Sequence, residues 1–155
     1  MTETKKRKHL FGPVPSRRLG QSLGVDIVPL KTCTQNCVYC QLGLDATTIA
    51  ERSQFEPIDI VLKELDEMIK TGLRADYITI SGSGEPTLHL GLGDLIKGIK
   101  KLTPIPVAVI TNGTLFSNPA VRQDCAKADL ILPSLDAGDP ETFEAMNHPF
   151  TAIDY

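Results

Sequence analysis

The sequence predicts an α/β domain in which a mainly parallel sheet is flanked by helices. Short apolar segments alternate along the chain with segments whose apolar residues recur at helical spacing. The apolar segments are almost continuous, which is typical of parallel strands buried on both faces. Polar motifs follow the ends of these segments. In parallel α/β folds ligands bind at that edge of the sheet, so we expect the functional site there.

Four strands are expected along the chain. Their residues are largely β-branched and apolar, and they are bounded by glycine, proline or small polar residues. Right-handed crossovers between parallel strands would bring all their C-terminal ends to one rim. The expected strands cover residues 25–30, 77–80, 105–110 and 130–132.

Four amphipathic helices are expected between and after these strands. The first follows Pro57, which suits the first helical position, and ends before Gly72, which suits a C-terminal cap. The third and fourth begin at an Asn-Pro and an Asp-Pro pair, which combine a capping side chain with a proline in the first turn. The expected helices cover residues 58–69 and 92–102 and begin at residues 118 and 139.

Composition limits the class of protein. Of the 155 residues 41% are hydrophobic and 23% are charged, which excludes a disordered chain and allows a sizeable core. No apolar run reaches the ~20 residues that a membrane helix needs, and no secretory signal is visible, so we expect a cytoplasmic protein with no membrane partner. Four cysteines in a reducing compartment indicate metal binding or catalysis before disulfides.

The net charge of −3 is unevenly distributed. Residues 1–31 hold seven basic and two acidic groups, while the remainder holds 9 basic and 17 acidic groups. This pattern indicates either a polyanionic partner such as RNA or a solvated N-terminus. Arg17 and Arg18 stand apart from the first basic run because they lie between turn residues close to the cysteines. We divide the chain into a basic arm, residues 1–10, and a core domain, residues 11–155.

Three cysteines, Cys33, Cys37 and Cys40, lie within the segment KTCTQNCVYCQLG. Thiolates this close together can surround one metal centre, and soft sulfur ligands favour zinc, copper or an iron–sulfur cluster. A structural zinc site would need a fourth ligand. Cys125 is expected on the buried side of the third helix, and the three histidines are scattered singly with surface or local hydrogen-bonding roles. A [4Fe–4S] cluster on three cysteines would leave one iron open to a further ligand.

Polar residues after the later strands complete the candidate site. In SGSGEPT, Gly82 and Gly84 allow a tight turn and close backbone approach, and Glu85 supplies a carboxylate for a cationic ligand. Asn112 follows the third strand in an Asn-Gly pair that alone is typical of a turn. Ser134 follows the fourth strand, where it either binds a ligand or caps the next segment.

The cysteine spacing C-x-x-x-C-x-x-C, with an aromatic residue before the last cysteine (Tyr39), resembles the signature of the radical S-adenosylmethionine (SAM) superfamily. The block FGPVPSRRLGQSLGVDIVPLKTCTQNCVYCQLG is similar to the N-terminal block of its wyosine-synthase-like subgroup of iron–sulfur oxidoreductases. SGSGEPTLH, VITNGTL and PSLDAGDPETFEAMNHP resemble later blocks of the same subgroup. The resemblance runs from Phe11 to the end of the chain.

This resemblance implies a partial (βα) barrel of the radical SAM type, with about four of the usual six βα units present. The core domain is then expected to be incomplete at its C-terminus, as a fragment of a longer protein. It also implies that three irons of a [4Fe–4S] cluster are held by the loop cysteines and that SAM binds the fourth. The implied residues are Cys33, Cys37 and Cys40 for the metal, and Tyr39, Ser83, Gly84, Glu85, Asn112 and Ser134 for SAM, with Asp136 as a further candidate.

The resemblance implies an enzyme in which one electron from the cluster cleaves SAM to a 5′-deoxyadenosyl radical, which abstracts hydrogen from a substrate. An electron donor such as flavodoxin or ferredoxin would serve as partner. The substrate is unknown, and RNA modification with tRNA as substrate is one expectation. No cysteine precedes Cys33, so a second three-cysteine cluster is not expected. The alternatives are a non-enzymatic zinc or iron–sulfur binding module and an inactive truncated fragment.

Overall fold

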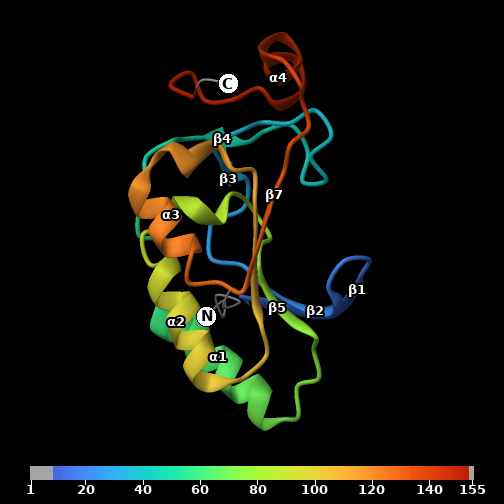
Figure 1. Cartoon of the computed structure of the whole chain (residues 1–155), viewed down its shortest axis with the longest axis vertical. Helices are drawn as coiled ribbons and strands as arrows, with labels where there is room; N and C mark the ends of the chain where they lie inside the picture. The colour runs from blue at the N-terminus through green and yellow to red at the C-terminus, as the bar shows by residue number, and fades with distance from the viewer. Residues whose placement is uncertain (1–8, 154–155) are drawn as a thin grey trace, which may run out of the picture.

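The computed structural model describes residues 9–153, which form a five-stranded sheet with helices on one face (Figure 1). The sheet order is β1-β2-β5-β6-β7. A second sheet of two short strands, β3 and β4, lies beyond the C-terminal ends of the parallel strands (Figure 1). The strands are β1 (Leu10–Ser16), β2 (Gly20–Val25), β3 (Thr32–Cys33), β4 (Thr47–Thr48), β5 (Tyr77–Ile80), β6 (Val107–Thr111) and β7 (Leu130–Pro133).

The main sheet is parallel apart from one edge. The pairs β2–β5, β5–β6 and β6–β7 are parallel, and only β1 runs antiparallel to its neighbour β2. Helices connect the parallel strands in chain order, as parallel pairing requires. These helices are α1 (Ile58–Lys70), α2 (Leu92–Leu102) and α3 (Pro119–Cys125), followed after β7 by α4 (Pro140–Asn147). Two 3-10 turns, η1 (Pro86–Leu88) and η2 (Thr114–Ser117), follow β5 and β6. The predicted α/β class with a mainly parallel sheet is confirmed.

The helices form where the apolar spacing and the capping residues predicted them. The first two occupy nearly the expected ranges, with their apolar stripes buried against the sheet. Asn118 accepts a hydrogen bond from the Ala120 amide at 2.9 Å and so caps α3. Asp139 accepts from the Thr142 amide at 2.8 Å and caps α4. Such caps satisfy amide groups that have no partner within the helix.

Alternate side chains give the two faces of the sheet different character. Leu23, Ile78 and Val107 pack with the helices in the hydrophobic core. Ser22 and Thr79 lie on the opposite face, where their hydroxyl groups hydrogen-bond to each other. The face that carries no helix is therefore polar where β2 and β5 pair, and its two hydroxyl groups satisfy each other.

The expected first strand, residues 25–30, is wrong in its position. The strand is β2, which ends at Val25, where the Val25 carbonyl accepts from the Ser81 amide at 3.0 Å. Ile27 and Val28 are buried, but the chain has already left the sheet there and leads toward the cysteines. An apolar run indicated the strand, whereas the actual strand contains glycines and polar residues because one of its faces is not part of the apolar core.

The antiparallel edge strand β1 was not expected at all. It contains Pro13 and Pro15, which lack an amide donor and are tolerated only where one side of the strand has no ladder partner. Phe11 of β1 lies directly over Gly24 of β2, where a Cβ atom would fall 2.0 Å from its ring. The ring of Phe11 therefore occupies the space that a side chain at residue 24 would need. Together β1 and β2 form a hairpin whose tip carries Arg17 and Arg18.

The basic run of the predicted N-terminal arm, residues 5–8, lies outside the described residues. His9, the first described residue, is buried, and its ring nitrogens hydrogen-bond to the carboxylates of Glu56 and Glu64 at 3.0 and 3.1 Å. The start of the described chain is thereby tied to α1. Between residues 9 and 153, no helix has the length and apolar character needed to cross a membrane.

Candidate functional site

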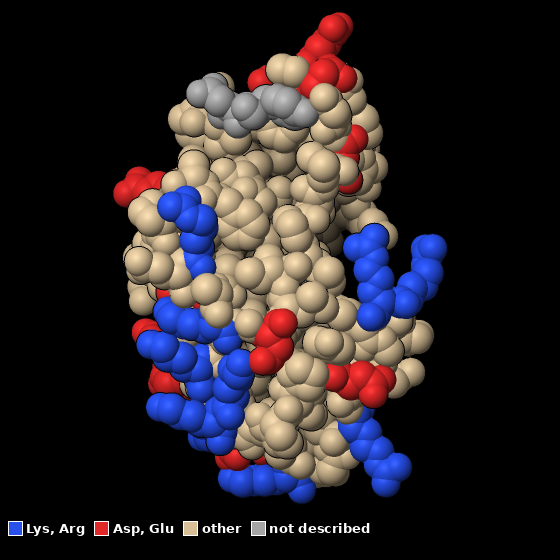
Figure 2. All heavy atoms as spheres, viewed as in Figure 1, with Lys and Arg blue, Asp and Glu red and all other residues tan. Residues whose placement is uncertain are grey.

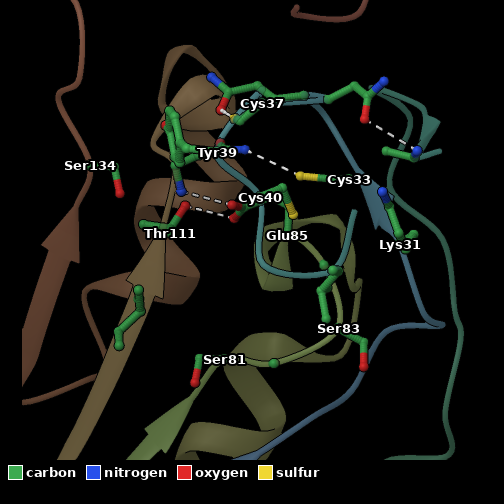
Figure 3. A pocket seen from close by; sticks show the side chains of 18 of the residues that line it. Lys31, Cys33, Cys37, Tyr39, Cys40, Ser81, Ser83, Glu85, Thr111 and Ser134 are labelled. Atoms are coloured by element: carbon green, nitrogen blue, oxygen red, sulfur yellow. Dashed lines mark hydrogen bonds between the residues drawn. The ribbon is translucent and has the colours of Figure 1, made fainter. Parts of the chain in front are cut away.

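A cavity of about 280 Å³ lies at the C-terminal ends of β5, β6 and β7, beneath the cysteine loop (Figure 3). Its walls come from four segments distant in sequence: the loop, the glycine-rich turn after β5, the end of β6 and the residues after β7. Every residue predicted to bind metal or cofactor borders this cavity, although their roles stay predictions. These residues are Cys33, Tyr39, Cys37, Cys40, Ser83, Gly84, Glu85, Asn112 and Ser134, together with Asp136.

The cysteine loop is held in shape by its own backbone. The Cys40 amide donates to the Cys37 carbonyl at 3.0 Å, and the Gly43 amide donates to the Cys40 carbonyl at 3.0 Å, so successive turns follow each other. Cys33 lies in β3, where its carbonyl accepts from the Ile49 amide at 2.9 Å. The three loop cysteines are free and partly buried. One strand end and two turns thus present three thiols to the same cavity.

Amide side chains donate hydrogen bonds toward two of the thiols. Asn112 Nδ2 lies 3.6 Å from Cys33 Sγ, and Asn147 Nδ2 lies 3.3 Å from Cys37 Sγ. Burial raises the pKa of Cys33 to about 11, so this thiol is protonated at neutral pH in the protein without metal. A metal that binds there must displace the proton, as thiolate ligation requires.

Three thiols are the donor type that an iron–sulfur cluster uses, with one thiolate at each of several separate irons. All three border the same cavity. Within residues 9–153, no group of three or more His, Cys, Asp and Glu side chains is arranged to hold a metal ion. Cys125 is 1% exposed in the hydrophobic core and is absent from the cavity lining, whereas a closed zinc site would need a fourth ligand beside the three loop thiols.

Two of the three histidines take the local hydrogen-bonding role that was expected as one alternative, and His148 is exposed at the surface. His9 is hydrogen-bonded to Glu64 of α1 and to Glu56, which precedes that helix, as described above. His89 is fully buried, with Nδ1 accepting from the Gly91 amide at 2.8 Å and Nε2 2.9 Å from the Glu56 carbonyl oxygen. Burial lowers the pKa of His89, which keeps the ring neutral. Neither ring borders the cavity.

Glu85 lies at the floor of the cavity with its carboxylate already engaged by the protein. Its oxygens accept from the Thr111 hydroxyl at 2.6 Å and from the Asn112 amide at 2.8 Å (Figure 3). They also accept from the amide and the hydroxyl of Thr87 at 3.1 and 2.6 Å. Burial raises the pKa of this carboxyl, while these hydrogen bonds oppose the shift. The side chain therefore ties the glycine-rich turn to the end of β6.

Asn112 extends this connection to the cysteine loop. Its Nδ2 donates to the Thr34 hydroxyl at 2.7 Å and reaches Cys33, while its Oδ1 accepts from the Thr114 amide at 3.1 Å. In an ordinary Asn-Gly turn, the Asn side chain would form its hydrogen bonds with groups of the same turn. Here the same amide group also bridges β6 to β3, which the turn motif alone does not indicate.

On the opposite wall, Tyr39 donates its phenolic hydrogen to Asp136, the residue predicted as a further cofactor contact. Partial burial and this hydrogen bond raise the pKa of Tyr39, so the phenol stays protonated and keeps donating. Ser134 is positioned through its backbone, whose amide donates to the Thr111 carbonyl at 2.9 Å. Its hydroxyl borders the cavity (Figure 3).

The sequence analysis did not assign a site role to several polar residues, among them Lys31, Gln35, Thr111 and Asn147. Lys31 begins the cysteine motif and Thr111 directly precedes Asn112, so both could have been included from their position. Gln35 lies inside the loop and accepts from Cys37 Sγ at 3.3 Å. Asn147 lies within the block PSLDAGDPETFEAMNHP, but its contact with the loop, 110 residues away, is not indicated by that block.

Comparison with known proteins agrees with this geometry. The family model of the radical SAM superfamily matches residues 27–153, which include the cysteine loop and every strand end that borders the cavity. A protein of Brachyspira hyodysenteriae named GTPase Obg is 47% identical over 150 residues, covering 97% of this chain and 22% of that protein. A UPF0026 protein of Synechocystis is 42% identical over 146 residues, covering 94% of this chain and 54% of its own length.

More distant similarity extends to a named enzyme. A probable GTP 3′,8-cyclase of Thermoplasma volcanium is 32% identical over 116 residues, covering 74% of this chain and 33% of that enzyme. The chain thus spans between 22% and 54% of the length of these relatives. Because the family model covers most of the chain, the chain belongs to the radical SAM superfamily.

Proposed function

We propose that this chain binds a [4Fe–4S] cluster and SAM and serves as the radical-generating part of an enzyme. The observation that carries the proposal is the convergence of the three loop cysteines, the glycine–glutamate turn and the ends of β6 and β7 on one cavity. Cluster and SAM, when bound, supply a radical able to abstract hydrogen from a substrate, with the electron coming from a donor such as flavodoxin or ferredoxin.

The roles of the residues follow from their chemistry and position. Cys33, Cys37 and Cys40 hold the cluster through their thiolates. Ser83 and Gly84 border the cavity and offer polar groups of the turn to the polar end of SAM, while Glu85 fixes that turn and adds negative charge near a cationic ligand. The remaining SAM contacts in this proposal are Tyr39, Asn112 and Ser134, which also border the cavity.

We further propose that the chain belongs to the wyosine-synthase-like subgroup of the superfamily. Its four parallel strands would then be the first βα units of a partial barrel. This assignment is supported by the sequence blocks around Arg17, the cysteine loop and Asn112. Under this assignment the substrate is RNA. The zinc alternative has no observation in its favour, since the core position of Cys125 removes it as a fourth ligand.

The proposal is tested by anaerobic reconstitution of the full chain followed by iron and sulfide analysis and EPR of the reduced protein. We expect iron and sulfide equivalent to one cluster per chain, and an EPR spectrum that changes when SAM is added because SAM binds the open iron. A colourless protein that takes up zinc instead contradicts the proposal. A cluster whose spectrum ignores SAM contradicts its SAM-binding half.

In this proposal the substrate binds in a second cavity, next to the cofactor cavity. The second cavity measures about 420 Å³ and is bordered by Arg18 and Leu19 of the β1–β2 hairpin. It shares Ile110, Ser134 and Asp136 with the cofactor cavity, so a ligand in one adjoins a ligand in the other. Figure 2 shows basic side chains on the hairpin that stand clear of the rest of the surface. Positive charge at this rim suits a phosphate of RNA.

Exchange of both hairpin arginines for glutamine, Arg17→Gln with Arg18→Gln, is expected to weaken binding of tRNA in a gel shift. Each lost phosphate contact lowers the slope of log affinity against log salt by roughly 0.7 to 0.9. The matched control, Lys63→Gln with Lys101→Gln, removes the same charge from the surface of α1 and α2. Equal loss in both double variants, or none in the first, rules out the hairpin as the RNA contact.

A further inference from the structure

The end of α4 holds the cysteine loop from outside. The Val38 amide donates to the Met146 carbonyl at 2.9 Å, and the Asn36 amide donates to the Asn147 carbonyl at 3.0 Å. Farther on, the Phe150 amide donates to the Thr34 carbonyl at 2.9 Å. Figure 1 shows α4 at the same end of the molecule as the short strands β3 and β4 that flank the loop. The loop conformation therefore depends on residues 146–150 as well as on its own turns.

One side chain of this segment reaches the thiols. Asn147 is 2% exposed, and its Nδ2 donates both to Cys37 Sγ at 3.3 Å and to the Tyr39 phenolic oxygen at 2.9 Å. The Tyr39 hydroxyl donates onward to Asp136. Because the phenol gives its hydrogen to Asp136, its oxygen can only accept from Asn147. This arrangement fixes the plane of the amide and directs one N–H at the sulfur.

The environment of the Asn147 amide oxygen indicates that the N–H groups of this side chain account for an asparagine at this position. Among residues 9–153, no hydrogen-bond donor reaches Asn147 Oδ1, although the atom is buried. A buried polar atom without a partner destabilises the fold, and a leucine of similar volume would avoid that cost. Packing therefore does not explain an asparagine at this position, whereas its two N–H donors do.

We propose that Asn147 is a positioning residue whose hydrogen bond to the Cys37 sulfur orients this ligand and makes the reduction potential of the bound cluster less negative. The inference rests on the proposed function, because it needs Cys37 to ligate a cluster. A hydrogen bond to a ligating sulfur strengthens as the sulfur gains negative charge. Reduction adds negative charge to the cluster and its sulfurs, so the donor stabilises the reduced form more than the oxidised one.

The test is an EPR-monitored redox titration of the reconstituted chain without SAM, comparing Asn147→Leu with the unsubstituted protein. We expect the cluster of the variant to have a more negative potential. At the midpoint potential of the unsubstituted chain, its ratio of reduced to oxidised cluster should be several-fold lower. The control is His148→Asn, since asparagine tolerates the left-handed backbone at φ 42° there and the His148 side chain borders neither cavity. It should leave the potential unchanged.

A second variant tests the inference if Asn147→Leu does not fold or does not assemble the cluster. Tyr39→Phe changes a half-exposed side chain and removes one of the two acceptors that fix the amide. We expect a smaller shift in the same direction, and no additional shift when it is combined with Asn147→Leu, because the two residues act through one hydrogen bond.

The outcomes separate this inference from the proposed function. An unsubstituted chain that assembles no cluster overturns the proposed function. A chain that assembles the cluster but shows equal potentials with and without the Asn147 amide overturns the inference alone. If Asn147→Leu cannot be loaded, an unchanged potential in Tyr39→Phe overturns it as well. A purely structural role would change the urea midpoint without moving the potential.

Discussion

Alanine in place of Cys33, Cys37 or Cys40 is expected to abolish cluster assembly in the reconstituted chain. Each thiol borders the same cavity, and nothing else in its walls offers a comparable soft ligand. Loss of one of three ligands leaves two irons exposed to solvent and to exchange. We expect iron and sulfide to fall to background and the visible absorbance of the cluster to disappear, while the far-UV circular dichroism stays that of the folded domain.

The matched control is Cys125→Ala, which removes the fourth cysteine. Cys125 is buried in the core at the end of α3, so its loss leaves a small cavity that costs about 1 kcal/mol of unfolding free energy. Its iron content should equal that of the unsubstituted chain. If a loop variant retains full cluster absorbance, or if Cys125→Ala loses it, the assignment of the ligands is wrong.

Gly84→Ala is expected to lower the stability of the fold strongly. A Cβ atom at this position would lie 1.8 Å from the Thr32 carbonyl oxygen and 2.8 Å from its carbon. The turn after β5 would have to move away from β3, which breaks the hydrogen bond from the Glu85 amide to the Thr32 carbonyl at 3.0 Å. We expect a loss of about 3 kcal/mol or more in urea unfolding, since backbone cannot yield as a side chain can.

Because Thr32 directly precedes Cys33, the same displacement should also reduce cluster loading. The control is Gly138→Ala, at an exposed position where a Cβ atom would meet nothing within 4 Å. It should leave both the urea midpoint and the iron content unchanged. Equal midpoints for the two alanine variants would show that the turn does not need this close approach.

Much of the fold was predictable from local pattern. The helices α1 and α2 matched their expected ranges because their apolar residues recur at helical spacing and face the core. The starts of α3 and α4 were set by capping side chains next to proline, which the structure confirms through the hydrogen bonds of Asn118 and Asp139. Both signals act within a few residues, so the sequence contains them directly.

The first strands were not predictable in the same way. The strand β2 holds glycine and polar residues because its outer face carries Ser22 and the space for Phe11, so apolar continuity pointed to the wrong residues. The edge strand β1 contains prolines, which argue against a strand unless its edge position is known. That position is a property of the assembled sheet.

The candidate site likewise has features that the sequence indicates and features that depend on the tertiary structure. Residue type and spacing, together with the resemblance to the radical SAM superfamily, indicated which side chains to expect there: three thiols in one loop, a glycine–glutamate turn, and polar residues after successive strands. Parallel pairing then implied one shared edge, which the cavity confirms in its lining. The roles of these residues in binding are the part that experiment has to supply.

Only the tertiary structure decided how those residues are held. Glu85 accepts four hydrogen bonds from the protein, Asn112 bridges β6 to the loop, and Asn147 reaches Cys37 from the far end of the chain. Such contacts join segments many residues apart, and they depend on the side-chain directions that packing fixes. Helical spacing, caps and cysteine motifs are local and can be seen in the sequence. The hydrogen bonds that orient the ligands arise only when distant segments meet.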